Sequence, residues 1–193
     1  MSVGIAGTRS TIAKEFQKLV PESENVQLRK LATLGHHHRR YLICTGYLAG
    51  RDIRELSLQE QQDTMDLNFV AVAQFCEAVL SKNTRARICV LGSESGFKGS
   101  FDQAYAGAKA ALHHYVQTTN PSDAEQMLVA LAPHIIWDSN MTQEREDVGN
   151  MPALGRMNRT KKWLTASEVA KTAHWLLYDA PVSLSGQVIR MRP

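Results

Sequence analysis

The chain has 193 residues, 44% of them hydrophobic, which fits one globular domain over residues 1–193 with a sizeable core. Its formal net charge of +3 at pH 7 is too small to indicate a nucleic-acid-binding surface, which needs a clustered basic stripe. No apolar run is long enough to cross a bilayer, and the segment that follows Met1 resembles a strand rather than a charged leader. We therefore expect a cytoplasmic protein with neither a nucleic-acid nor a membrane partner.

Neither the cysteines nor the histidines form a metal-binding pattern. Cys44, Cys76 and Cys89 lie within apolar stretches, which is typical of buried, reduced thiols. Residues 36–40, His-His-His-Arg-Arg, point their side chains in different directions and have no second ligand group at a recognisable spacing. We expect no metal site, and a solvated loop at residues 36–40 with anion binding as the alternative.

Short apolar segments alternate with amphipathic segments along the whole chain. The apolar segments predict strands at residues 3–6, 26–31, 41–45, 86–91, 127–132 and 188–191. Apolar residues at helical spacing predict helices at residues 11–20, 57–80, 102–119 and 167–178. Strands that alternate with helices form parallel β-α-β units, so we expect an α/β fold with a doubly wound parallel sheet. Residues 140–165 lack a clear period and are expected to form a short substrate lid.

A tyrosine and a lysine four residues apart carry the clearest chemical signal. Tyr105 and Lys109 occupy positions i and i+4 of a predicted helix, which puts both side chains on one face. A nearby ammonium favours the phenolate, so Lys109 is expected to lower the pKa of Tyr105 toward the range of general acid–base catalysis. Ser93 lies upstream in the sequence Gly-Ser-Glu-Ser-Gly, where it is placed to share a hydrogen bond with a substrate oxygen.

With these residues and this order of strands and helices, the chain resembles the short-chain dehydrogenases/reductases from its first strand to its C-terminus. In that family a Rossmann-type domain binds NAD(H) or NADP(H), and an Asn-Ser-Tyr-Lys set performs the proton chemistry. The matching positions are Asn68, Ser93, Tyr105 and Lys109. The spacing from Ser93 to Tyr105 is one residue shorter than the family's commonest form, and Ser95 remains an alternative for the catalytic serine.

The turn after the first strand corresponds to the family's Gly-x-x-x-Gly-x-Gly pattern, which receives a pyrophosphate at a helix N-terminus. Gly7 matches the first glycine, whereas Thr11 and Ala13 replace the second and third. Thr11 is expected to cap the helix and leave backbone N–H groups free for phosphate. The resemblance implies cofactor contacts from Gly7, Arg9, Ser10, Thr11 and Ile12. A capped helix without a ligand explains this turn equally well.

The end of the second predicted strand indicates which dinucleotide is bound. Arg29 and Lys30 lie there without a competing Asp or Glu, and a basic side chain pairs with a 2′-phosphate, so NADP(H) is favoured over NAD(H).

The linker between Leu31 and Tyr41 is too short for the family's usual strand-helix unit, so we expect the sheet to be shortened by about one such unit. The resemblance implies further cofactor contacts from Thr45, Gly46, Tyr105, Lys109, Pro133 and Ile136.

The segment after the fifth predicted strand resembles the family's Pro-Gly segment that passes the nicotinamide. His134 replaces the usual glycine, and Thr142 falls near the phosphate-contacting threonine. In the lid region, four apolar residues are candidates either to line a substrate pocket or to anchor the loop: Met151, Leu154, Met157 and Trp163.

Together these features predict an NADP(H)-dependent oxidoreductase that interconverts a carbonyl and a hydroxyl group on a small substrate. The expected roles are proton exchange by Tyr105, contact with the nicotinamide ribose by Lys109, orientation of the substrate oxygen by Ser93 and support of a water relay by Asn68. The alternative is a non-catalytic Rossmann-fold protein that senses a nucleotide or mediates an interaction. Helix 102–119, with small side chains, and helix 57–80, apolar nearly all round, predict a homodimer or homotetramer. Burial within one subunit is the competing explanation.

Overall fold

The structure is a computed structural model that describes residues 2–30, 38–144, 148–150, 153, 155–156 and 158–193. Its centre is a six-stranded parallel sheet with the order β2-β1-β3-β4-β5-β6. The strands are β1 (Val3–Ala6), β2 (Glu24–Asn25), β3 (Arg40–Ile43), β4 (Arg87–Leu91), β5 (Met127–Pro133) and β6 (Val188–Met191). The strand order reverses between β1 and β3, which confirms the doubly wound topology and creates a crevice at the carboxyl ends of these strands.

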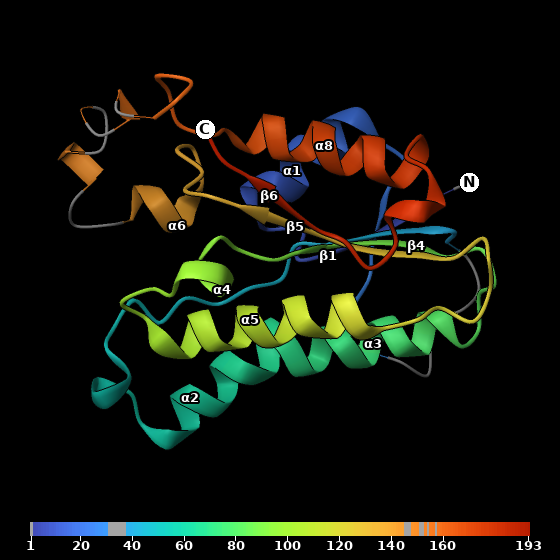
Figure 1. Cartoon of the computed structure of the whole chain (residues 1–193), viewed down its shortest axis with the longest axis horizontal. Coiled ribbons are helices and arrows are strands. Elements are labelled where there is room, and N and C mark those ends of the chain that lie inside the picture. Colours follow the sequence, from blue (N-terminus) through green and yellow to red (C-terminus); the bar gives the residue numbers. More distant parts are fainter. Residues whose placement is uncertain (1, 31–37, 145–147, 151–152, 154, 157) are drawn as a thin grey trace.

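Helices cover both faces of the sheet (Figure 1). One face carries α1 (Thr11–Leu19) and α8 (Ala166–Tyr178), and the other carries α2 (Leu58–Met65), α3 (Ala71–Leu80) and α5 (Gln103–Thr118). The shorter elements are α4 (Ser95–Lys98), α6 (Asn140–Gln143) and the 3₁₀ turns Ile53–Glu55, Val148–Asn150 and Val182–Leu184. Within the described part of the chain, no helix is long and apolar enough to cross a bilayer.

Two buried clusters join the sheet to its helices, one on each face. The strand β4 shows how the sequence supplies both, because successive side chains of a strand point to opposite faces. Cys89 and Leu91 belong to the cluster under α1 and α8, whereas Ile88 and Val90 belong to the cluster under α3 and α5. A continuous apolar run is therefore needed in a strand that is covered on both sides.

All six predicted strands and four predicted helices are present, but the second strand is displaced. It occupies Glu24–Asn25 and pairs only with Gly4 and Ile5 of β1, whereas residues 26–31 were expected to form it. Val26 still donates its N–H to the Ile5 carbonyl (2.9 Å), but beyond it Leu28 is buried in the cluster beneath α3, and the chain turns between Gln27 and Lys30. The apolar character of Leu28 therefore reflects burial against the core rather than strand pairing.

The predicted helix 57–80 is interrupted by one wide π-turn, Asp66–Val70, between α2 and α3. Asn68 lies fully buried inside this turn. Its amide donates to the carbonyls of Tyr47 (2.8 Å) and Thr64 (2.9 Å), and its oxygen accepts from the Tyr47 N–H (3.2 Å). The π-turn thus brings a polar side chain from a mostly apolar helix against the chain that follows β3, and such turns are frequent at functional sites.

Candidate active site

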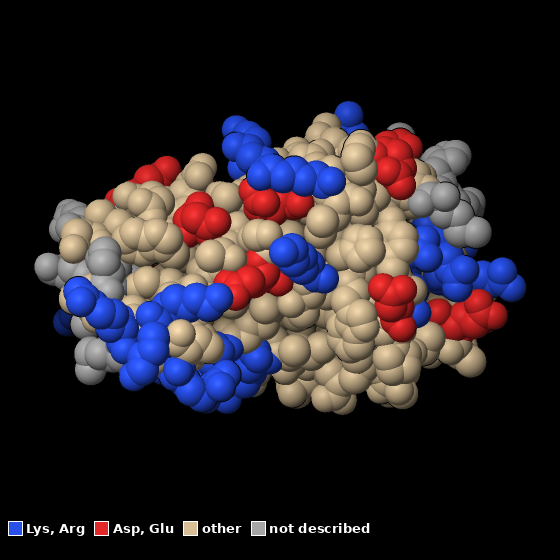
Figure 2. All heavy atoms as spheres, turned by 90° about the horizontal axis from the view of Figure 1, so that it is seen from above, with Lys and Arg blue, Asp and Glu red and all other residues tan. Residues whose placement is uncertain are grey.

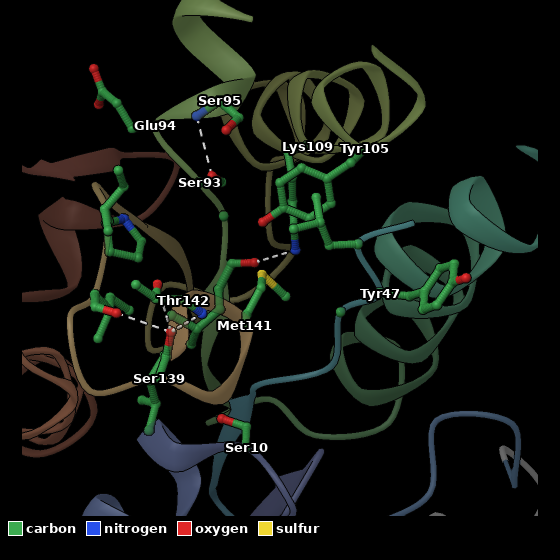
Figure 3. A pocket seen from close by; sticks show the side chains of 18 of the residues that line it. Ser10, Tyr47, Ser93, Glu94, Ser95, Tyr105, Lys109, Ser139, Met141 and Thr142 are labelled. Carbon is green, nitrogen blue, oxygen red and sulfur yellow. Dashed lines mark hydrogen bonds between the residues drawn. The ribbon is translucent and has the colours of Figure 1, made fainter. Parts of the chain in front are cut away.

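A cavity of about 770 Å³ opens at the carboxyl ends of β1, β3, β4 and β5 (Figure 3). The turn after β1, the segments after β3, β4 and β5, and the helices α4, α5 and α6 each contribute part of its wall. Most of the residues that the sequence singled out line it: Gly7, Arg9, Ser10, Thr11, Ile12, Thr45, Gly46, Ser93, Tyr105, Lys109, Pro133 and Ile136. The fold therefore collects residues from distant parts of the chain around one space.

Tyr105 and Lys109 project from the same face of α5 into this cavity, as Figure 3 shows. The helix begins after Asp102, whose buried carboxylate accepts hydrogen bonds from the N–H groups of Tyr105 (2.9 Å) and Gly50 (2.9 Å). The Lys109 ammonium donates to the Leu91 carbonyl (2.8 Å) and lies 5.7 Å from the centre of the Tyr105 ring. Asp102 thus fixes the start of α5, and the end of β4 fixes the lysine.

Burial dominates the electrostatics of this pair. It raises the pKa of the Tyr105 phenol, with the Asp102 carboxylate adding to the rise and a hydrogen bond with Ser93 opposing it. Burial also lowers the pKa of the Lys109 ammonium to about 8. Burial thus moves the pKa of Tyr105 in the direction opposite to the one expected from Lys109, because desolvation disfavours the charged phenolate.

Of the two candidate serines, Ser93 is the one whose hydroxyl acts on the Tyr105 phenol, since it lowers the pKa of that phenol. Its hydroxyl also accepts from the Ser95 N–H (3.1 Å), so Ser95 supports the position of Ser93 (Figure 3). The Ser93 N–H donates to Nε2 of His113 (3.3 Å), a buried histidine one helical turn after Lys109. Burial lowers the pKa of His113 to about 4, which keeps its imidazole neutral and able to accept this bond near neutral pH.

The turn after β1 has the backbone geometry that the first glycine requires. Gly7 adopts a φ of +82°, and a Cβ there would lie 2.7 Å from the carbonyl carbon of Cys44. Ser10, rather than Thr11, caps α1 by accepting from the Ala13 N–H (3.3 Å). The predicted cap was wrong by one residue, because Ser10 retains extended backbone geometry and Thr11 is already helical. The Thr11 hydroxyl donates to Asn140 at the start of α6 (3.3 Å).

Arg29 and Lys30 lie outside the set of residues that line the cavity, whereas Arg9 lines it. Arg29 forms an ion pair with Asp66, the first residue of the π-turn. The local sequence around Arg29 contains no competing acid, but the fold brings Asp66, 37 residues away in the chain, into contact with Arg29.

The segment after β5 lines the cavity with Pro133, His134, Ile135 and Ile136. Ile136 pairs with Leu164 as an isolated parallel bridge, and the His134 N–H donates to the Met191 carbonyl (2.9 Å). Thr142 is buried and bonded to Ser139, which caps α6. Of the apolar candidates in the lid region, Met151, Leu154 and Met157 lie outside the described residues, and Trp163 stacks on His134 with ring centres 6.0 Å apart.

Sequence reasoning missed a buried ionic group beside Ser93. Glu94 is only 3% exposed and accepts hydrogen bonds from the guanidinium groups of Arg190 and Arg192, at the C-terminal end of β6. The Arg190 guanidinium also lies 4.2 Å from the centre of the Phe97 ring. The partners are 96 and 98 residues apart, so no local pattern links them. The ion pairs tie the Ser93 loop to the last strand.

Gly92 allows this loop to close on His113. A Cβ at Gly92 would lie 2.4 Å from Nε2 of His113 and 3.2 Å from the Leu131 carbonyl oxygen. We expect Gly92→Ala to lower the free energy of unfolding by about 1–3 kcal/mol, because the new methyl group would overlap the His113 ring, which also packs against Phe97. Urea denaturation measures this change. Gly149→Ala is the matched control, since its Cβ meets nothing within 4 Å, and equal stability of the two variants would contradict the expectation.

Comparison with known proteins places this site in context. A sequence model described as short chain dehydrogenase matches residues 41–148. No curated protein sequence shows a significant match. Among solved structures, a Brucella melitensis short-chain dehydrogenase/reductase described as a glucose/ribitol dehydrogenase has a TM-score of 0.86 at 15% identity, covering 98% of this chain and 94% of that one. The ligand-free Thermoplasma acidophilum aldohexose dehydrogenase has a TM-score of 0.85 at 13% identity, with 98% and 91% covered.

A third solved structure is an actinorhodin polyketide ketoreductase with NADPH, which has a TM-score of 0.82 at 14% identity and covers 99% of this chain and 95% of that one. At these low sequence identities, the structural similarity shows the fold alone. The sequence match carries the family assignment, because residues 41–148 are more than half of the 193 residues. The chain belongs to the short-chain dehydrogenase/reductase family of oxidoreductases.

Proposed function

We propose that this protein is an NADP(H)-dependent oxidoreductase that interconverts a carbonyl and a hydroxyl group on a small substrate. The observation that carries the proposal is the placement of Tyr105, Lys109 and Ser93 around one cavity at the carboxyl ends of the sheet. A phenol kept protonated by burial can donate a proton to a carbonyl oxygen. The hydroxyl of Ser93, which lines the same cavity, can orient that oxygen.

The residues of the cavity fit a dinucleotide. Gly7 leaves room for a close approach to the backbone, and the N-terminus of α1 presents N–H groups that favour an anion. The Thr45 hydroxyl is buried at the cavity without a hydrogen-bond partner among the described residues. Gly46 lies close to Asn68 and Lys109, since a Cβ there would be 3.3 Å and 3.7 Å from their polar atoms. When bound, the nicotinamide supplies or accepts a hydride.

The proposed roles follow from these positions. Tyr105 exchanges a proton with the substrate oxygen, and Ser93 orients that oxygen. Lys109, held by the Leu91 carbonyl, is placed to contact the nicotinamide ribose. Asn68 positions the segment at Tyr47 and supports a water relay toward Lys109. Met141 and Thr142 line the cavity from α6, which supports a lid function for residues 140–165.

We assign the preference for NADP(H) chiefly to Arg9, because its side chain lines the cavity beside the turn after β1. Arg29 and Lys30 remain candidates for the same 2′-phosphate. Arg29 should contribute less than Arg9 to binding of the 2′-phosphate, since its ion pair with Asp66 must break before it can bind another anion.

A fluorescence titration with NADPH and NADH tests the proposal. We expect tighter binding of NADPH, and a loss of about tenfold in NADPH affinity in Arg9→Ala, since a charge-assisted hydrogen bond to phosphate is removed. Arg29→Ala should have a smaller effect. Lys14→Ala, a control for an exposed cation on α1 that does not line the cavity, should bind as the parent does. No binding of either nucleotide at millimolar concentration would support the alternative of a non-catalytic interaction protein.

The oligomeric state is a separate prediction. On the outer face of α5, Gly107 and Ala110 are exposed, and Leu67 (37% exposed) and Val70 (36%) belong to the neighbouring π-turn. Small side chains beside exposed apolar ones suit helix packing between two copies. We expect size-exclusion chromatography with light scattering to give a homodimer or homotetramer at micromolar concentration, and Gly107→Arg to give a smaller species. A monomeric parent protein would contradict this prediction.

A further inference from the structure

A lysine and a histidine form a polar pair on the wall of the cavity beyond Ser93. Lys98 ends α4, and its ammonium lies 3.2 Å from Nε2 of His134, the residue that replaces the family's glycine after Pro133. Both residues line the cavity. An ammonium has only donors, so the imidazole must accept at Nε2 and is neutral, and two of the three ammonium donors are left for other groups.

This pair is distant from the phosphate-binding turn. Lys98 follows β4 and His134 follows β5, whereas Gly7 and Arg9 follow β1. In the strand order β1-β3-β4-β5, two or three interstrand steps separate the two places. Each step is about 4.8 Å, so the separation is roughly 10–14 Å. Arg9, in the turn after β1, is thus placed for a dinucleotide's phosphates, and Lys98 is not.

The cavity around the pair has an excess of positive charge. Its lining includes the cations Arg9, Lys98 and Lys109, and its single acidic residue among those described is Glu94, which is already paired with two arginines. Figure 2 shows Lys and Arg side chains gathered at the lower left, at the end of the molecule that carries α4 and α6 in Figure 1. Several exposed cations come from the segment before α8: Arg156, Arg159, Lys161 and Lys162.

The imidazole of His134 is partly buried and packs against a neighbouring aromatic ring. Its ring stacks on Trp163, and its Nδ1 is buried without a hydrogen-bond partner among the described residues. Burial and the adjacent Lys98 lower its pKa, which agrees with a neutral ring that accepts from the lysine. Apolar residues also line the cavity, among them Phe101 and Met141. The cavity therefore combines apolar lining residues with the ammonium of Lys98, which is exposed to solvent and directed toward His134.

We propose that Lys98, oriented by His134, binds a carboxylate on the carbonyl substrate, so that the protein acts on an oxo acid with an apolar body rather than on a neutral ketone or aldehyde. The inference rests on the proposed function for its chemistry, but the anion site itself can be tested without turnover. A single ammonium matches a monoanion, and the apolar walls match the body of an aryl or alkyl oxo acid.

Calorimetric titration of the protein with benzoate and its neutral analogue benzamide tests the site without a reaction. We expect benzoate to bind more tightly than benzamide, and Lys98→Met to weaken benzoate binding by about tenfold, since one charge-assisted hydrogen bond is lost. Lys98→Arg should retain the binding. Lys171→Met, an exposed lysine on α8, is the control and should leave the affinity unchanged. Equal affinity of the parent and Lys98→Met for benzoate would overturn the proposal.

A matched pair of substrates tests the consequence for turnover. Benzoylformate and its methyl ester present the same ketone with and without a charge. We expect kcat/KM with NADPH to be higher for the acid than for the ester. Lys98→Met should reduce the ratio of the two kcat/KM values about tenfold. Reduction of the ester in preference to the acid would overturn the carboxylate inference and leave the oxidoreductase standing. Benzoate binding that depends on Lys98, without reduction of any carbonyl compound, would support the anion site and contradict the proposed reaction.

Discussion

Replacing Tyr105 with phenylalanine is expected to lower kcat/KM for carbonyl reduction by about 10²–10⁴-fold, because the substitution removes the proton donor and little else. The phenol belongs to the cavity lining, as Ser93 does, and the aromatic ring, on the buried face of α5, is retained in the variant. Turnover is measured with NADPH on any carbonyl compound that the parent protein reduces.

Tyr115→Phe is the matched control for this experiment. It removes a phenol from the same helix, one that donates to Glu77 (2.8 Å) and does not line the cavity. Its turnover should equal that of the parent protein. If Tyr105→Phe retains most of its turnover, the assignment of Tyr105 as the proton donor is wrong.

The pH dependence of reduction should follow from the same pair of residues. Burial raises the pKa of Tyr105, so the phenol keeps its proton well above neutral pH. Burial lowers the pKa of Lys109 to about 8, so its positive charge is complete below that pH and is lost as the pH rises through it. We therefore expect the rate of reduction to decline above about pH 8. A rate that stays constant to pH 10 would show that the Lys109 charge is not required.

Gly7→Ala is expected to lower the free energy of unfolding by roughly 2–5 kcal/mol. Part of this cost is the left-handed backbone, because Gly7 has a φ of +82°. The remainder is overpacking, because the new Cβ would lie 2.7 Å from the carbonyl carbon and 2.8 Å from the backbone nitrogen of the Cys44–Thr45 peptide. Backbone atoms of the segment directly after the central strand β3 cannot move aside as a side chain can. Urea denaturation measures the change.

Gly50→Ala separates these two contributions. Gly50 also has a left-handed φ, of +73°, but a Cβ there meets nothing within 4 Å. Its variant should lose only about 1–2 kcal/mol, the cost of the backbone conformation alone. Equal losses in the two variants would show that the contact between Gly7 and the Cys44–Thr45 peptide is not tight.

The local sequence was enough to predict the sheet and much of the cavity. Continuous apolar strands covered on both faces, with helical periods between them, are consistent only with a parallel α/β fold, and all six strands are found. The i, i+4 spacing of Tyr105 and Lys109 placed both on one helix face, since helix geometry is independent of the rest of the chain. Gly7 ended the first strand, and its backbone conformation is one that side chains disfavour.

Predictions that depended on a distant partner were less successful. The apolar pattern at residues 26–31 predicts a strand, but Leu28 packs into the core instead. Arg29 was expected to meet no acid, but the π-turn presents Asp66 to it. A sequence pattern predicts that a residue will be buried or charged, but it does not predict which distant residue will contact it.

The sequence by itself determined the order of the strands and helices, the face of α5 that bears Tyr105 and Lys109, and the family to which they belong. These properties follow from local patterns: the face of α5 follows from helix geometry within one turn, and the order of the elements follows from the spacing of apolar residues. Only the tertiary structure decided that burial raises the Tyr105 pKa, that Glu94 is held by two arginines of the last strand, and that His134 meets Lys98. Desolvation and pairing between distant charges depend on which surfaces come together, and parallel strands bring together residues that the chain itself holds far apart.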